Sequence, residues 1–151
     1  MISNLSVAIL LLSLACSGAF IVWSSHRPTR RHLLNKLYMW MLFSYAVWAI
    51  MLLGMSITPS SRVDMLFVLD ALTYEGIMIP AFYLMISITF AHGYDRLPKW
   101  CFLLLVIPIC SVFVCLTNPL HHLQYQQFSV IRSEIVFGPF VMVTGVHSYV
   151  C

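Results

Sequence analysis

The segment from Met65 to His92 constrains the fold more than any other part of the chain. It is a mostly apolar run that carries two acids, Asp70 and Glu75, and one proline, Pro80. About 20 apolar residues in a helix cross the hydrocarbon core of a bilayer. Counted back from His92, that length places Glu75 just inside the hydrocarbon and Asp70 about one turn outside it, among the headgroups. Because an acid at such depth is costly, Glu75 is expected to serve a ligand or a proton, or else to snorkel or stay protonated.

Further apolar runs on both sides of this segment are typical of a multi-pass membrane protein. Of the 151 residues, 61% are hydrophobic and only 9% are charged, whereas soluble domains have about 25% charged residues. We predict an all-α polytopic membrane helix bundle that forms one region over residues 1–151. The spans are expected at residues 5–23, 37–57, 70–92, 99–116 and 138–151. The fifth run reaches only about two-thirds of a full span, so we expect the chain to be a fragment that is incomplete at its C-terminal end.

The placement of the basic residues predicts the orientation. They gather in the loops after the first and third spans, at Arg27, Arg30, Arg31, Lys36, Arg96 and Lys99. By the positive-inside bias these two loops are cytoplasmic, which places the N-terminus outside. No nucleic-acid partner is expected, because topology and anionic lipid explain a basic cluster beside a span.

Neither catalysis nor metal binding is indicated by the motifs. The chain lacks the patterns G-x-x-x-x-G-K, G-x-S-x-G, H-E-x-x-H and G-x-G-x-x-G, so we predict no catalytic residue and no cofactor. Each cysteine lies within an apolar run, and none forms a C-x-x-C pair. We interpret all five as structural, without disulfides or metal: Cys16, Cys101, Cys110, Cys115 and Cys151.

The candidate ligand-binding residues belong to the side that is expected to face outward. They are Asp70, Glu75, Asn118, His121 and His122. Asp70 and Tyr74 are four residues apart and share a helix face, whereas Glu75 lies about 140° round from Asp70.

The histidines leave several interpretations open. His121 and His122 form an interfacial cap or turn, contact a ligand or proton, or bind a metal, although no further metal ligand is visible. His147 faces either the same cavity or the helix bundle.

Two local features of the backbone are also expected. Pro80 removes a donor and clashes with the carbonyl of Gly76, which predicts a kink that is either a hinge or a static bend. Residues 128–131 and 134–137 are rich in β-branched and aromatic side chains and predict a small hairpin, although Arg132 and Ser133 are poor turn residues.

Several short motifs follow one another in a fixed order. They are Ile79-Pro80-Ala81-Phe82, Asp95-Arg96, Thr117-Asn118-Pro119-Leu120-His121-His122, Gly138-Pro139-Phe140 and His147-Ser148-Tyr149. This series resembles the N-terminal seven-helix membrane region of bacterial sensor histidine kinases. The resemblance implies a seven-helix sensor in the bacterial plasma membrane with an outside N-terminus. Its seventh helix would lead to a cytoplasmic output domain, usually a kinase and sometimes a cyclase for a cyclic dinucleotide.

We therefore predict a membrane sensory module, not an enzyme, that relays an outer-face or intramembrane stimulus to an output domain absent from this chain. The expected partners are the lipid bilayer, an unidentified small-molecule or physical stimulus and the downstream cytoplasmic domain, and a homodimer is left open. Two alternatives remain: a fragment of a transporter or channel in which Glu75 titrates along a pathway, and a membrane scaffold without a ligand.

Overall fold

A computed structural model of the chain describes residues 4–25 and 32–151. Helices dominate the described residues, and a single two-stranded antiparallel sheet interrupts them. In chain order the elements are α1 (Asn4–Ser25), α2 (His32–Ile57), α3 (Val63–Thr73), η1 (Tyr74–Ile77), α4 (Met78–His92), η2 (Lys99–Leu105), α5 (Val106–Leu116), α6 (Asn118–His121), β1 (Tyr125–Gln127), η3 (Arg132–Glu134), β2 (Val136–Phe137) and α7 (Phe140–Val150).

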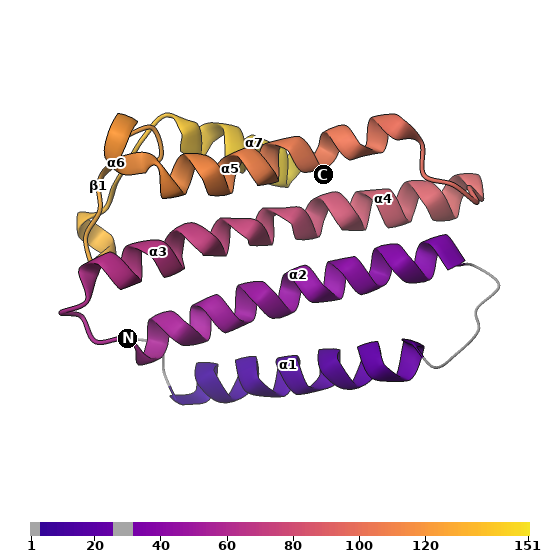
Figure 1. Ribbon diagram of the computed structural model, residues 1–151, viewed down its shortest axis with the longest axis horizontal. Coiled ribbons are helices and arrows are strands. Elements are labelled where there is room, and N and C mark those ends of the chain that lie inside the picture. The colour runs from indigo at the N-terminus through magenta and orange to yellow at the C-terminus, as the bar shows by residue number, and fades with distance from the viewer. Residues whose placement is uncertain (1–3, 26–31) are drawn as a thin grey trace.

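The helices form a bundle in which neighbours along the chain lie side by side in alternating directions (Figure 1). α2 packs against α1 on one side and against α3 and α4 on the other, and α5 contacts both η1 and α7. Among the described residues, three helical stretches are long and apolar enough to cross a bilayer, namely Leu33–Ile57, Val63–His92 and Lys99–Leu116. Shorter apolar helices cover Val7–Trp23 and Phe140–Val150. The all-α architecture that the sequence predicts is confirmed.

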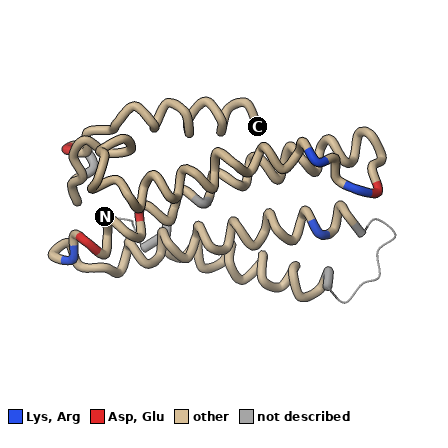
Figure 2. The backbone as a smooth tube through the Cα atoms, turned by 45° about the horizontal axis from the view of Figure 1, so that its top comes forward, with Lys and Arg blue, Asp and Glu red and all other residues tan. Residues whose placement is uncertain are grey.

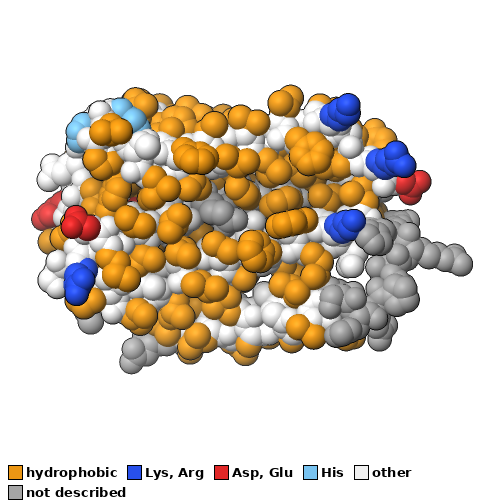
Figure 3. Space-filling view, in the orientation of Figure 1, with side chains coloured by type: hydrophobic (Ala, Val, Ile, Leu, Met, Phe, Trp, Pro, Cys, Tyr) orange, Lys and Arg blue, Asp and Glu red, His pale blue; other side chains and the backbone are white. Residues whose placement is uncertain are grey.

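The surface of the bundle is that of a protein in lipid. Apolar side chains cover the visible side of the molecule, charged side chains gather at its two ends, and the visible histidine side chains lie at the left end (Figure 3). Large apolar side chains that water would disfavour are exposed along the helices, including Leu12, Phe43, Phe90, Leu103 and Val146. Such an apolar belt is stable when hydrocarbon replaces water around it.

The two ends of the bundle differ in charge (Figure 2). The end with the α4–η2 connection, which we call the basic end, carries Lys36, Arg96 and Lys99. The opposite end, which we call the hairpin end, includes the α2–α3 connection and the hairpin segment (residues 117–139), with Arg62, Asp64 and Glu134. The basic residues Arg27, Arg30 and Arg31 lie outside the described residues.

The third helical stretch changes geometry one turn before Pro80. It is α-helical in α3, becomes a 3₁₀-helix over η1 and returns to α-helix in α4. Because Pro80 has no N–H, the carbonyl of Gly76 has no donor four residues further along, and the tighter η1 turn falls where Pro80 predicts a kink.

A second proline explains the position of His147. Pro108 leaves the carbonyl of Leu104 without its helical donor, and the helix preceding it is 3₁₀ (η2) instead of α. His147 Nε2 on α7 lies 2.9 Å from this carbonyl oxygen. Since a carbonyl only accepts, Nε2 carries the hydrogen and donates it to Leu104. His147, which is 6% exposed, thus belongs to the helix bundle and ties α7 to the η2–α5 junction.

The expected hairpin exists, but its first strand lies earlier in the chain than predicted. β1 pairs with β2, so that Tyr125 is opposite Phe137 and Gln127 is opposite Val136. The connection includes η3, where Ser129 Oγ donates a 2.8 Å hydrogen bond to Glu134 Oε2. A tight turn at Arg132 and Ser133 is replaced by this longer loop, because neither residue favours the backbone of a two-residue hairpin turn.

Candidate functional site

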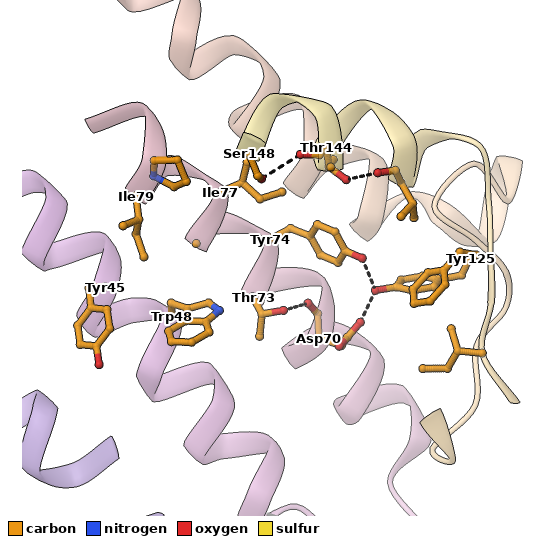
Figure 4. A pocket seen from close by; sticks show the side chains of 16 residues that line it. Tyr45, Trp48, Asp70, Thr73, Tyr74, Ile77, Ile79, Tyr125, Thr144 and Ser148 are labelled. Atoms are coloured by element: carbon orange, nitrogen blue, oxygen red, sulfur yellow. Dashed lines mark hydrogen bonds between the residues drawn. The ribbon is translucent and has the colours of Figure 1, made fainter. Parts of the chain in front are cut away.

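A cavity of about 860 Å³ lies toward the hairpin end of the bundle (Figure 4). Its walls come from α2, from the α3–η1–α4 stretch, from the hairpin segment and from α7. Small-molecule sites in proteins typically have volumes of roughly 300–1,000 Å³ and are mostly apolar with a few polar groups. The lining residues used below are Tyr45, Trp48, Asp70, Thr73, Tyr74, Gly76, Pro80, Tyr125, Phe137, Thr144, Gly145 and Ser148.

The polar centre of the cavity is a chain of three side chains (Figure 4). Tyr125 Oη donates a short hydrogen bond to Asp70 Oδ2, and Tyr74 Oη lies 3.1 Å from Tyr125 Oη. Because Tyr125 has only one hydroxyl hydrogen and gives it to Asp70, Tyr74 donates to Tyr125. Asp70 and Tyr74 meet the same partner because their spacing of four residues puts them on one helix face, as the sequence predicts. The hairpin segment is thus bonded to the third helical stretch.

Tyr125 remains a hydrogen-bond donor at physiological pH. Its side chain is 2% exposed. Burial, followed by the hydrogen bonds and charge interactions with Asp70 and Tyr74, raises the pKa of Tyr125 above its ordinary value of 10.0. The phenol therefore stays neutral over the whole physiological range and keeps its hydrogen for Asp70.

Asn118 holds Tyr125 in position through three hydrogen bonds. Its Oδ1 accepts from the backbone N–H groups of Gln124 and Tyr125, both at 2.9 Å, and its Nδ2 donates to the carbonyl of Tyr125 at 2.9 Å. Asn118 is 4% exposed, so these bonds replace water for backbone groups that would otherwise be buried without partners.

Aromatic contacts complete the setting of Tyr125. Its ring lies 6.3 Å from Phe67, 5.5 Å from Phe128 and 5.8 Å from Phe137, measured between ring centroids. These tilted and edge-to-face arrangements are the favourable ones for aromatic pairs.

Gly138 joins the hairpin segment to α7. Its N–H donates to the carbonyl of Gln124 at 2.7 Å, and the N–H of Phe140 donates to the carbonyl of Leu123 at 3.0 Å. A Cβ on Gly138 would lie 2.1 Å from the Leu123 oxygen and 2.5 Å from its carbonyl carbon. Only glycine therefore allows the two backbone stretches to approach this closely.

Gly76 provides the corresponding space on the opposite wall. A Cβ at this position would lie 2.5 Å from Cδ1 of Trp48. The indole of Trp48 thus packs directly on the backbone of η1 and forms an aromatic wall of the cavity.

Of the candidate residues from the sequence, Asp70 lines the cavity. Asp70 lies within α3, which begins at Val63, so it is flanked by helix on both sides. The backbone of Glu75 is in η1, but its side chain lies outside the described part of the structure. Asn118 is bonded to its own segment, as described above.

The two adjacent histidines form a turn. His121 Nδ1 accepts from the N–H of Leu123, and Nε2 lies 3.0 Å from Thr117 Oγ1, which donates to the carbonyl of Phe113. His122 follows α6 in the left-handed conformation, with φ of 53°, and is exposed. Among the described residues, no group of three or more potential metal-ligating side chains occurs.

The sequence did not single out Tyr125, Trp48, Thr144 or Ser148 as site residues, although Ser148 belongs to one of the family motifs. They come from elements far apart in the chain and meet only in the folded bundle. The one local signal for the placement of Tyr125 was Asn118 followed by Pro119. An asparagine at such a turn often forms hydrogen bonds with nearby backbone groups, as Asn118 does with Gln124 and Tyr125.

A family model for the N-terminal 7TM region of histidine kinase matches residues 7–151. The chain belongs to this family. The 7TM region is the membrane input module of a kinase, and residues 7–151 therefore contain no kinase catalytic domain. The apolar helices of the bundle are accordingly those of a multi-span membrane region. No curated protein and no solved structure matches the chain.

Proposed function

We propose that this 7TM region senses a ligand or physical stimulus in the cavity at the hairpin end and relays it to a cytoplasmic output domain that follows the complete region. The proposal is supported above all by the hydrogen bond between Tyr125 and Asp70. This bond connects the hairpin segment to the third helical stretch beside the cavity. An occupant that displaces Tyr125 breaks this bond and lets the hairpin segment move relative to the third helical stretch. Such an occupant binds the arrangement with the bond broken more tightly than the arrangement with the bond intact, and therefore shifts the equilibrium between them.

α7 is the element that carries this change along the bundle. Its first turn is bonded to the hairpin segment through Phe140 and Leu123, so a displacement of the segment moves the start of α7. In the proposed region, α7 leads toward the remaining spans and the output domain.

The proposed orientation places the N-terminus and the hairpin end outside the cell. The basic end carries Lys36, Arg96 and Lys99 with the acid Asp95, whereas the hairpin end contains two arginines, Arg62 and Arg132, together with Asp64 and Glu134. This distribution supports a cytoplasmic basic end in a bacterial plasma membrane.

Cysteine labelling in intact cells tests the orientation. Single cysteines are introduced at Ser61, in the α2–α3 connection, and at Tyr94, in the α4–η2 connection, both of which are exposed. The background protein has all five native cysteines replaced by alanine or serine. A membrane-impermeant maleimide is expected to label Ser61→Cys in intact cells and Tyr94→Cys only after lysis. The reverse pattern would refute the orientation.

Autophosphorylation of the complete kinase in proteoliposomes tests the relay. Asp70→Asn and Tyr125→Phe each weaken a charge-assisted hydrogen bond worth roughly 1.5–3 kcal/mol. If this bond biases the two arrangements, we expect basal autophosphorylation to change about tenfold in both variants. Asp64→Asn removes an exposed acid of the same helix and should leave the rate unchanged. Equal rates in the wild type, Asp70→Asn and Tyr125→Phe would exclude the relay.

A further inference from the structure

We propose that the cavity binds a primary ammonium group on a small amphipathic molecule, with Asp70 as the counter-ion and aromatic rings around the cation. This inference rests on the proposed sensory function and names the ligand class of its site.

The charge of the cavity favours a cation. Asp70 is the one charged side chain among the cavity-lining residues that the structure describes. Its carboxylate only accepts hydrogen bonds, and Tyr125 donates to its Oδ2. An ammonium group brings three donors and can share the carboxylate with the phenol or replace it.

The hydroxyl groups of Thr73, Thr144 and Ser148 are arranged as acceptors. Thr73 Oγ1 donates to the carbonyl of Asp70 at 2.6 Å, Thr144 Oγ1 to Val141 at 2.9 Å, and Ser148 Oγ to Thr144 at 2.9 Å (Figure 4). Each of these side chains has thereby used its only hydrogen, so its oxygen offers lone pairs to an occupant. A ligand rich in donors complements these three oxygens, whereas an anion would be repelled by the Asp70 carboxylate.

The aromatic walls add to the same preference. Trp48 and Tyr74 line the cavity together with Tyr45, Tyr125 and Phe137. The face of an aromatic ring attracts a cation, most strongly for tryptophan, and the attraction grows where water is excluded. The rings also bury the apolar part of an amphipathic amine.

Fluorescence of Trp48 measures the binding directly. The other tryptophans, Trp23, Trp40 and Trp100, are exposed and are replaced by phenylalanine, which leaves Trp48 as the single reporter. The protein in phosphatidylcholine nanodiscs is titrated with 2-phenylethylamine and, separately, with the neutral 2-phenylethanol. We expect a saturable change with the amine and affinity at least about tenfold weaker for the alcohol, because the charged hydrogen bond to Asp70 is missing. Equal affinities for the amine and the alcohol, or no response to the amine, would overturn the proposal. This test leaves every residue of the cavity unchanged.

Two variants then locate the charge. Asp70→Asn is expected to weaken amine binding about tenfold and to leave alcohol binding unchanged. Asp64→Asn, which is exposed on the same helix and outside the cavity lining, should change neither. Unaltered amine affinity in a folded Asp70→Asn variant, with helix content checked by circular dichroism, would rule out Asp70 as the counter-ion.

The ammonium group can come from a free amine or from an ethanolamine lipid headgroup. In nanodiscs that contain phosphatidylethanolamine, the apparent amine affinity falls if the headgroup occupies the cavity and is unchanged if the site takes free amines. Binding is measured without any kinase output, so failure of the amine to bind leaves the sensory relay standing. Conversely, unchanged autophosphorylation in the relay experiment leaves amine binding standing.

Discussion

Gly138→Ala is expected to detach the hairpin segment from the start of α7. The added Cβ would overlap the backbone of Leu123 at 2.1 Å, and backbone cannot turn aside as a flexible side chain can. Relief requires the hydrogen bonds from Gly138 to Gln124 and from Phe140 to Leu123 to break. We expect a loss of about 3 kcal/mol in local stability. Hydrogen exchange should therefore show roughly hundredfold lower protection of the Gly138 and Phe140 amides.

Gly145→Ala is the matched control for this substitution. Gly145 also lines the cavity, but a Cβ there meets nothing within 4 Å. Alanine is a better helix former than glycine by about 1 kcal/mol, so this variant should be as stable as the wild type or more stable. Full amide protection in Gly138→Ala would show that the backbones of Gly138 and Leu123 do not approach as closely as the structure shows.

Asn118→Ala is expected to release Tyr125 from its position. The substitution leaves the N–H groups of Gln124 and Tyr125 and the carbonyl of Tyr125 without partners in a buried setting. Unpartnered buried groups cost about 1–3 kcal/mol each, so we expect a total loss of about 3 kcal/mol or more. Limited proteolysis should then cut the hairpin segment at least about tenfold faster, because its open form is more populated.

Gln126→Ala serves as the control for Asn118→Ala, because Gln126 is exposed and lies next to Tyr125 on β1. Its cleavage rate should match that of the wild type. Asn118→Asp is a finer probe, since it keeps the oxygen acceptor and loses only the amide donor. The cleavage rate of Asn118→Asp should fall between those of the wild type and Asn118→Ala. Equal cleavage of the wild type and Asn118→Ala would mean that Asn118 does not hold the segment.

The parts of the structure that depend on helix periodicity were predictable from the sequence. A low share of charged residues and long apolar runs lead to an all-α membrane bundle, because lipid leaves few other ways to satisfy the backbone. The spacing of Asp70 and Tyr74 predicts a shared face, and both side chains do reach one partner. The motif series that includes Thr117–His122 identified the histidine-kinase 7TM family correctly.

The hairpin and the cavity depend on contacts between distant residues, which local patterns do not contain. β-propensity favoured residues 128–131 for the first strand, yet β1 begins at Tyr125 because Asn118 fixes that residue's backbone. The cavity combines Trp48 on α2, Asp70 on α3 and Ser148 on α7. No periodicity in a single run shows that these three meet. The role predicted for Glu75 stays a prediction.

The contact between His147 and the carbonyl of Leu104 limits how the fifth apolar helix can move. Because Pro108 has no N–H, the carbonyl oxygen of Leu104 is left to accept from His147 at this one position along the neighbouring helix. If α7 slid by a full turn, this oxygen would lose its donor in a region without water to replace it. Tilting about this point keeps the bond intact. We therefore expect α7 to tilt about His147 without sliding, so that the stretch from Phe140 to His147 swings together with the hairpin segment.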